Sequence, residues 1–160
     1  MSKTILLTIA IALAACGGSS PSTAASSPSS AASPSAAATG AKIAAAANPK
    51  YGQILVDAKG MTVYLFLKDT GTTSTCYDQC AAFWPPVLTD GKPQAGPGAD
   101  DSLLGTTTRT DGKVEVTYAG HPLYYFVKDK APGDTTGQGV NGFGALWWVL
   151  KPSGDAITTK

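Results

Sequence analysis

Short runs of alternating apolar and polar residues in the last two thirds of the chain predict β-strands. These runs lie at residues 53–57, 62–67, 113–118 and 123–127. β-Branched and aromatic side chains fill them, and Gly60 and Gly120 stand between the members of each pair, where a tight turn requires a positive φ. The pattern therefore predicts two β-hairpins.

A third apolar segment follows each hairpin after a polar loop. The two segments are residues 83–88 and 146–150, and large aromatic side chains lie at or near the start of each. The helix signal is confined to one or two turns around residues 75–83. The recurring unit is thus a hairpin, a loop and a strand.

The two units are an internal repeat. Residues 52–69 and 112–129 align without a gap at an offset of 60, with seven of eighteen positions identical. The folded part, residues 51–155 with repeats at about 51–90 and 111–151, is long enough for one core but not for two. We expect one all-β domain, a small pseudo-symmetric sandwich or partly open barrel with at most one short helix.

The N-terminus carries a different apolar segment. Lys3 precedes an apolar run at residues 5–13 that is too short to cross a bilayer, so residues 1–15 are predicted to be a secretory signal peptide. Residues 13–17, Leu-Ala-Ala-Cys-Gly, resemble the lipobox of bacterial lipoproteins, whose cysteine is acylated and becomes the mature N-terminus. This resemblance implies lipidation of Cys16 and anchoring to a membrane. An ordinary signal peptide with a chance cysteine is the alternative.

Composition separates a tether from the folded part. Residues 17–50 are almost entirely Ala, Ser, Pro, Gly and Thr, and all thirteen aromatic residues lie at or after Tyr51. We therefore expect residues 16–50 to be a lipidated cysteine and a disordered tether. From residue 51 on, 9 basic and 11 acidic residues give a net charge of −2, which is too little to attract nucleic acid or anionic lipid strongly.

Each repeat contains the motif Tyr-x-Phe-x-x-Asp. Its residues are Tyr64, Phe66 and Asp69 in the first repeat, and Tyr124, Phe126 and Asp129 in the second. In this motif, and in the segments 76–86 and 118–124, the chain resembles a family of predicted bacterial lipoproteins with a repeated Tyr-x-(Phe/Trp/Tyr)-x-x-Asp motif, the secreted-repeat lipoproteins of unknown function. The resemblance covers nearly all of residues 51–153 and implies no established activity.

Cys76 and Cys80 are the cysteines that remain beside Cys16. Four residues apart on a helical turn, their Cα atoms would be about 6 Å apart, a separation that a disulfide tolerates. We expect a structural disulfide in the loop before Trp84. The alternative is a copper(I) or thiol-redox site made of Cys76, Cys80 and His121, the single histidine of the chain, because two thiols and an imidazole suit copper(I).

The other candidates have both a structural and a binding interpretation. Asp69 and Asp129 end their strands, where a carboxylate that accepts backbone N–H groups would open the following loop. The alternative is an ion or ligand site shared with Asp134. Adjacent Trp147 and Trp148 must point to opposite faces of a strand, so one of them could be exposed. The possible contact residues for a glycan or protein partner are Trp84, His121, Trp147 and Trp148.

The sequence contains neither a Ser-His-Asp order with an elbow motif nor paired carboxylates at a distinctive spacing, so we expect no enzyme. We expect an extracytoplasmic lipoprotein, anchored to a bacterial membrane, that acts as a non-catalytic binding or structural module of the cell envelope. Its partners would be the membrane, through the lipid anchor, and an envelope protein or glycan, with no cofactor. The alternative is a periplasmic copper-binding or thiol-redox protein.

Overall fold

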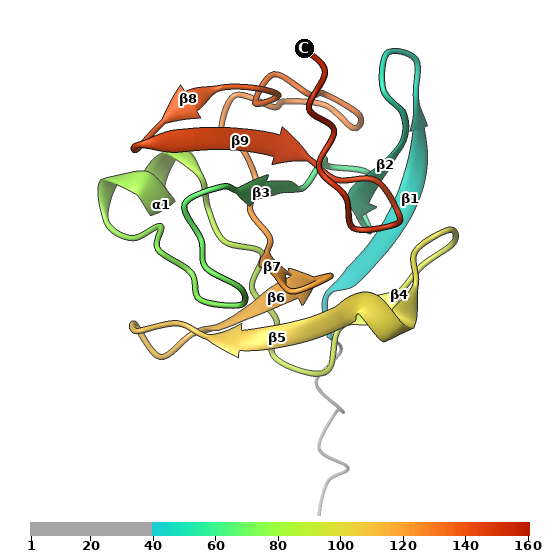
Figure 1. The fold of residues 1–160 in the computed structure, drawn as a ribbon. Helices are drawn as coiled ribbons and strands as arrows, with labels where there is room; N and C mark the ends of the chain where they lie inside the picture. The colour runs from blue at the N-terminus through green and yellow to red at the C-terminus, as the bar shows by residue number, and fades with distance from the viewer. Residues whose placement is uncertain (1–39) are drawn as a thin grey trace, which may run out of the picture. The chain divides into compact units, whose positions relative to one another are not determined.

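The structure, a computed structural model, describes residues 40–160 (Figure 1). Its elements are β1 (Lys42–Asn48), β2 (Gly52–Asp57), β3 (Tyr64–Phe66), α1 (Gln79–Phe83), β4 (Gln94–Ala95), a 3-10 turn (Asp101–Leu103), β5 (Leu104–Thr108), β6 (Val114–Tyr118), β7 (His121–Pro122), β8 (Asn141–Gly142) and β9 (Ala145–Val149). The expected all-β class with a short helix is confirmed. The signal peptide, Cys16 and the tether up to residue 39 lie outside the described residues. Among those described, no helix is long and apolar enough to cross a membrane.

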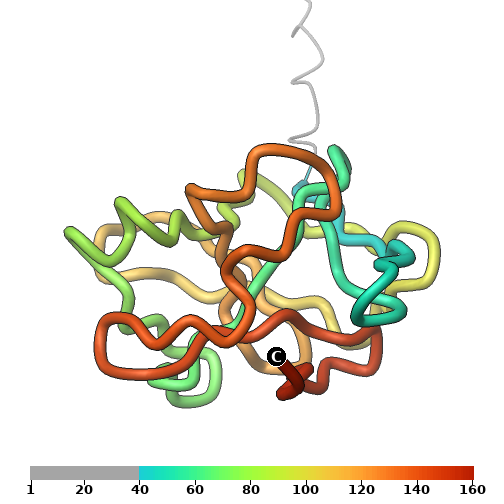
Figure 2. The backbone as a smooth tube through the Cα atoms, turned by 90° about the horizontal axis from the view of Figure 1, so that it is seen from above, coloured from blue at the N-terminus to red at the C-terminus, as the bar shows by residue number. Residues whose placement is uncertain are grey.

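The strands of the described part form three small sheets. Their strand orders are β2-β1-β4, β3-β9-β8 and β5-β6-β7. β4 runs parallel to β1, whereas the other strand pairs are antiparallel. Figures 1 and 2 both show the segment after β9 passing beside β2. The two are joined by a hydrogen bond of 3.0 Å from the Leu55 N–H to the Leu150 carbonyl. This bond connects the sheet of β2 to the segment that follows β9.

The two repeats are interlocked. β3 of the first repeat pairs with β9 of the second. In the other direction, the N–H groups of Tyr125 and Val127 in the second repeat donate to the carbonyls of Pro85 and Phe83 in the first, at 2.8 and 3.1 Å. The last segment of each repeat thus completes the hairpin of the other, so one repeat alone cannot close this structure.

Tyr64 and Tyr124 mark the centre of this arrangement. The backbone N–H of each donates to the carbonyl of the other, at 2.8 and 2.9 Å. The two tyrosines occupy the same position in their repeats, at the offset of 60 residues. The pair of bonds is therefore reciprocal, as the expected pseudo-twofold relation between the repeats requires.

The core consists of two clusters of buried side chains, to which β9 contributes from both faces. Trp147 belongs to the cluster that contains Trp84, and Trp148 belongs to the cluster that contains Leu55. All buried members of both clusters come from residues 43–157. Residues 40–160 thus carry a complete core, lie within one compact unit, and are expected to fold without the preceding segment.

The turns of the two expected hairpins are present, but β2 and β3 lie in different sheets, and β6 pairs with β7 rather than with residues 123–127. Three predicted strands are shorter than the apolar pattern suggested, and the first of them, residues 62–67, is reduced to β3. The predicted strand at residues 123–127 contains isolated bridges from Tyr124 to Tyr64 and to Pro86. The predicted strand at residues 83–88 likewise forms only bridges. Pro85 and Pro86 have no N–H group, so a regular ladder cannot continue through them.

The predicted tether is wrong at its C-terminal end, because Lys42–Asn48 form β1. This strand pairs with β2 over six residues, from Ile43 opposite Asp57 to Asn48 opposite Gly52. The segment after β4 (Gln94–Ala95) approaches this strand closely, since a Cβ atom on Gly96 would lie 2.7 Å from the Cβ of Ala44. The alanine run that resembles a linker is therefore a strand against which another segment packs closely.

Candidate functional site

The repeated tyrosines and aspartates pair across the repeats. The Tyr64 O–H donates to Asp129 Oδ2 at 2.6 Å, and the Tyr124 O–H donates to Asp69 Oδ2 at 2.7 Å. Burial, reinforced by nearby carboxylates, raises the pKa of both tyrosines, so both hydroxyls keep their protons and act as donors at neutral pH. The tyrosine and the aspartate of the motif thus form hydrogen bonds between the two repeats.

Each of these aspartates also fixes the loop that follows it. Asp69 Oδ1 accepts the N–H and O–H groups of Thr75, at 2.8 and 2.7 Å. Asp129 Oδ1 accepts the N–H and O–H groups of Thr136, at 2.9 and 2.5 Å. The loop-opening role expected from the sequence is therefore present in both repeats.

Removing the Tyr64 hydroxyl will weaken the contact between the repeats. We expect Tyr64→Phe to lower the free energy of unfolding by about 1.5–3 kcal/mol, because the bond involves a charged, buried partner. A double-mutant cycle with Asp129→Asn, measured by urea unfolding, will give a coupling energy above about 0.5 kcal/mol. The matched cycle of Tyr64→Phe with Asp69→Asn, in the same repeat, will give a smaller one. Equal coupling in both cycles contradicts the cross-repeat pairing.

Trp84 and Trp147 form the centre of a buried stack of four rings. Their planes differ by 4° and their ring centroids are 4.0 Å apart. Trp147 also stacks on Phe66 at 3.9 Å, and Trp84 stacks on Phe126 at 4.1 Å. Each tryptophan thus packs on the motif phenylalanine of the other repeat, which gives Phe66 and Phe126 a role in the core.

The prediction of an exposed tryptophan that could contact a partner is wrong. Trp84, Trp147 and Trp148 have exposed fractions of 1%, 0% and 5%. Trp147 and Trp148 do belong to different clusters, but both faces of β9 are covered, so neither ring reaches solvent. His121, in β7, is half-buried. None of the three tryptophans is available to a glycan or protein.

Cys76 and Cys80 form the expected disulfide, with their Cα atoms 5.2 Å apart. Both residues are buried, and the bond uses both thiol groups. Copper(I) binding through these sulfurs would need prior reduction of the disulfide. Within residues 40–160, no three His, Cys, Asp or Glu side chains form a group that could hold a metal ion, and this includes His121 and Asp134.

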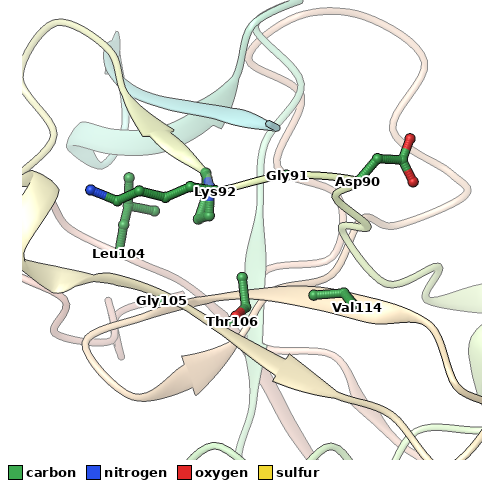
Figure 3. A pocket seen from close by; sticks show the side chains of 8 residues that line it. Asp90, Gly91, Lys92, Leu104, Gly105, Thr106 and Val114 are labelled. Carbon is green, nitrogen blue, oxygen red and sulfur yellow. The ribbon is translucent and has the colours of Figure 1, made fainter. Parts of the chain in front are cut away.

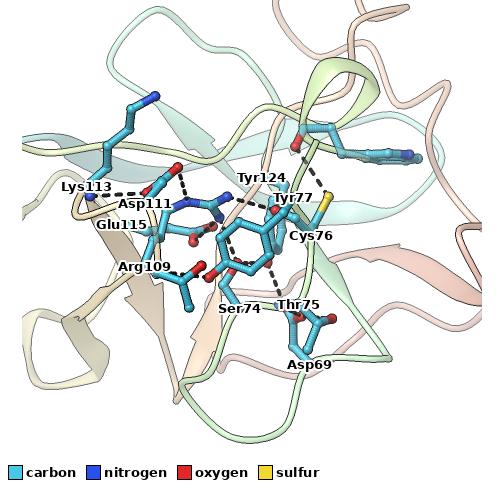
Figure 4. A network of polar contacts seen from close by, with 12 residues as sticks. Asp69, Ser74, Thr75, Cys76, Tyr77, Arg109, Asp111, Lys113, Glu115 and Tyr124 are labelled. Carbon is cyan, nitrogen blue, oxygen red and sulfur yellow. Dashed lines mark hydrogen bonds and ion pairs between the residues drawn. The ribbon is translucent and has the colours of Figure 1, made fainter. Parts of the chain in front are cut away.

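A buried ion pair lies beside the disulfide. Arg109 Nη1 donates to Glu115 Oε2 at 2.8 Å and to Ser74 Oγ at 2.7 Å, and Nη2 donates to the Cys76 carbonyl at 2.8 Å. Figure 4 shows the guanidinium among these groups, with the Tyr77 ring against it at 4.4 Å from Arg109 Cζ to the ring centroid. Arg109 therefore ties the loop before α1 to β6.

The ion pair is connected to the cross-repeat contact and breaks the symmetry of the repeats. Ser74 Oγ lies 2.8 Å from the Tyr124 hydroxyl, which itself bonds Asp69. Burial raises the pKa of Glu115 to about 7, against the opposing effect of Arg109. In the first repeat, Leu55 occupies the position of Glu115 and is equally buried. The second repeat thus uses a charge where the first uses an apolar side chain.

A pocket of about 290 Å³ lies between the loop before β4 and the sheet of β5 and β6 (Figure 3). Its charged lining residues are Asp90 and Lys92, and both are exposed. Lys92 also pairs with Asp101, at 3.4 Å between Nζ and Oδ2. Because this pocket has no buried polar group to orient a ligand, we place the candidate site elsewhere.

An apolar groove of about 200 Å³ is the better candidate. It is lined by Phe83, Trp84, Phe126, Val140 and Phe143, with Lys128 as its charged member. We call it the Phe83–Phe143 groove, because these two rings, 6.0 Å apart between centroids, are 42% and 38% exposed. Figure 1 shows α1 and the turn between β8 and β9, which carry the two rings, at the same end of the domain.

Phe143 occupies an unfavourable backbone conformation. It and Gly144 form the two-residue turn between Gly142 and Ala145, and both have positive φ, 57° and 97°. Such turns favour Asn-Gly, and an L-residue with a Cβ atom loses about 1–2 kcal/mol in this region. The chain therefore holds an exposed aromatic ring at a position where neither turn geometry nor core packing requires one.

Neither this groove nor the ion pair was predicted from the sequence. Phe143-Gly144 could have been recognised as a turn, since it stands two residues before the apolar segment at residues 146–150. No spacing indicated that α1 would bring Phe83 to the same place. Glu115 carried no signal either, because a charged residue within an alternating strand is ordinarily assigned to the solvent face, and Arg109 lies outside the predicted strands.

The fold and these contacts define a class: a two-repeat β domain with a disulfide, in which the repeated tyrosines and aspartates pair between repeats. A family model described as a secreted repeat of unknown function matches residues 45–88 and 105–151. The chain belongs to this family. The two matches start 60 residues apart, the offset of the internal repeat, and the first starts within β1. No curated protein and no solved structure matches the chain.

Proposed function

We propose that this protein is a lipoprotein held at the extracytoplasmic side of a membrane by lipidated Cys16, with its β domain as a non-catalytic binding or structural module. The family description as secreted supports the location. A buried disulfide between Cys76 and Cys80 also fits an oxidising compartment. The short apolar segment before Cys16, with its lipobox-like end, supports the anchor.

One observation carries the non-catalytic part of this proposal: the repeated motif is used to build the fold. The Tyr64 and Tyr124 hydroxyls are engaged by Asp129 and Asp69, and the same aspartates hold the following loops. Their side chains are thus committed to structural bonds. A partner from the cell envelope would instead meet the exposed Phe83–Phe143 groove, where two aromatic rings face solvent.

Acylation of Cys16 is tested with the full chain expressed in a bacterial host and labelled with radioactive palmitate. We expect the label to be incorporated and the protein to fractionate with membranes. Cys16→Ser, which leaves residues 40–160 unchanged, will lose the label. Cys76→Ser with Cys80→Ser is the matched control, and it will keep the label. Wild-type chain without label in the soluble fraction would contradict the proposed anchor.

A further inference from the structure

The Phe83–Phe143 groove combines apolar and cationic groups. Phe83 and Phe143 are its exposed apolar members, Trp84 and Phe126 beside them are 1% and 7% exposed, and Lys128 is its charged member. Lys68 lies close by, since its Nζ is 3.8 Å from the position of a Cβ atom built on Gly144, in the same turn as Phe143. A ligand that satisfied both features would be apolar and anionic at once.

A third lysine adds to this charge. Lys130 donates through Nζ to the carbonyl of Val127, whose N–H is bonded to the carbonyl of Phe83. Lys68, Lys128 and Lys130 are exposed, and in the part of the chain that the structure describes none of them forms an ion pair. Among the described residues, none of the adjoining carboxylates pairs with a lysine side chain. Asp69 and Asp129 bond tyrosines and threonines, and Asp134 accepts the backbone N–H groups of Lys130 and Ala131.

We propose that the Phe83–Phe143 groove and its three lysines form a docking surface for an anionic lipid bilayer. Exposed phenylalanine rings enter the apolar region below the headgroups, while lysines beside them reach the lipid phosphates. The proposal rests on the proposed function in one respect, since the Cys16 anchor would keep a membrane within reach of the domain. The lipid contact itself uses residues 83, 143, 68, 128 and 130, and needs no acyl chain on the protein.

Charge favours a bilayer over a second copy of this chain. In a twofold contact through the groove, each patch meets its own equivalent, so three lysines would face three lysines. Like charges at such a contact oppose association. A bilayer rich in phosphatidylglycerol presents the charge opposite to that of the three lysines together with an apolar interior, which matches both components of this local surface, although the folded part as a whole has a net charge of −2.

The strained conformation of Phe143 supports the same assignment. An Asn side chain would satisfy the turn at positive φ, whereas Phe143 sits there at φ 57° and remains 38% exposed. A local rule that is broken without benefit to the core supports a role of the residue in contact with a partner. Replacing Phe143 by Asn thus removes the exposed ring while it preserves the turn, so its effect on binding can be measured without loss of folding.

The test is flotation of residues 40–160, without a lipid anchor, with vesicles of phosphatidylglycerol and phosphatidylcholine at 3:1, and with vesicles of phosphatidylcholine alone. We expect binding to the anionic vesicles that weakens with salt, and little binding to the neutral ones. Phe143→Asn will weaken binding at least tenfold, because it removes the apolar ring. Lys128→Gln will weaken it about fivefold, the effect of one lysine at an anionic surface.

Leu88→Asn is the matched control for Phe143→Asn. It removes an apolar side chain of similar exposure, 42% for Leu88 against 38% for Phe143, that does not line the groove, and it will leave binding unchanged. The melting temperature of Phe143→Asn will be equal to or above that of the wild type. Equal binding to both vesicle types, or wild-type binding by Phe143→Asn, overturns the proposal. Self-association that Phe143→Asn abolishes, without vesicle binding, would also overturn it and indicate a second copy instead. Failure of palmitate labelling leaves this result unaffected.

Discussion

Arg109→Met will destabilise the domain by about 3–5 kcal/mol, one of the two largest effects that we expect. The substitution leaves Glu115 fully buried without its cationic partner, and unpaired buried charges carry a cost of this size. It also removes the donors to Ser74 and to the Cys76 carbonyl, so the loop before α1 loses its contact with β6. Urea unfolding at pH 7 measures the change.

The double variant Arg109→Met with Glu115→Leu is the control. We expect it to recover most of the lost stability, because a buried ion pair can often be replaced by apolar side chains at little cost, and Leu55 already fills the equivalent position in the first repeat. No recovery in the double variant would show that Ser74 and Cys76, rather than Glu115, account for the loss.

The Glu115 carboxyl also determines how the stability of the wild type depends on pH. Its folded-state pKa, raised to about 7 by burial, exceeds the ordinary value of 4.5 that applies in the unfolded chain. The folded state therefore binds this proton more tightly, and its contribution to stability is lost as the pH rises from 4.5 through 7. Arg109→Met removes the group that opposes this shift, so its deficit will be larger at pH 8 than at pH 5.

Trp147→Ala will cost about 3–5 kcal/mol through the cavity that it leaves. Trp147 is fully buried and contacts Phe66 and Trp84 on its two faces, so the loss also breaks a stack that joins the repeats. Thermal unfolding followed by circular dichroism measures the effect. Phe83→Ala, at a half-exposed ring, is the matched control and will cost about 1 kcal/mol or less. Equal costs for the two would contradict the packing described for the stack.

The turns and the first strands of the two hairpins could be predicted because alternation and turn glycines are local signals. β2 and β6 lie within one residue of the predicted runs, and the two-repeat organisation follows from the identities at a fixed offset. β1 could not be predicted, because alanine has no strong preference for strands and its importance depends on Gly96, some fifty residues away. The same composition therefore describes a linker and a closely packed strand.

The candidate site shows the same limit. The motif spacing correctly indicated that Asp69 and Asp129 fix the following loops, but it could not indicate that each is paired with the tyrosine of the other repeat. Opposite orientation of Trp147 and Trp148 was also correctly inferred from the period of a strand. The burial of both rings was not inferred, because whether a strand face is exposed depends on what packs against it, and two clusters cover both faces of β9.

The interlocked repeats also determine when the chain can fold. The pairing of Leu65 with Trp148 joins residues that are far apart along the chain, and the same strand carries Trp147 of the aromatic stack. Contacts of this sequence separation make folding slow. A chain that is secreted N-terminus first would thus stay without a stable core until its last strand has followed. Late folding would keep the polypeptide unfolded during export, and a product truncated before β9 would be susceptible to proteolysis.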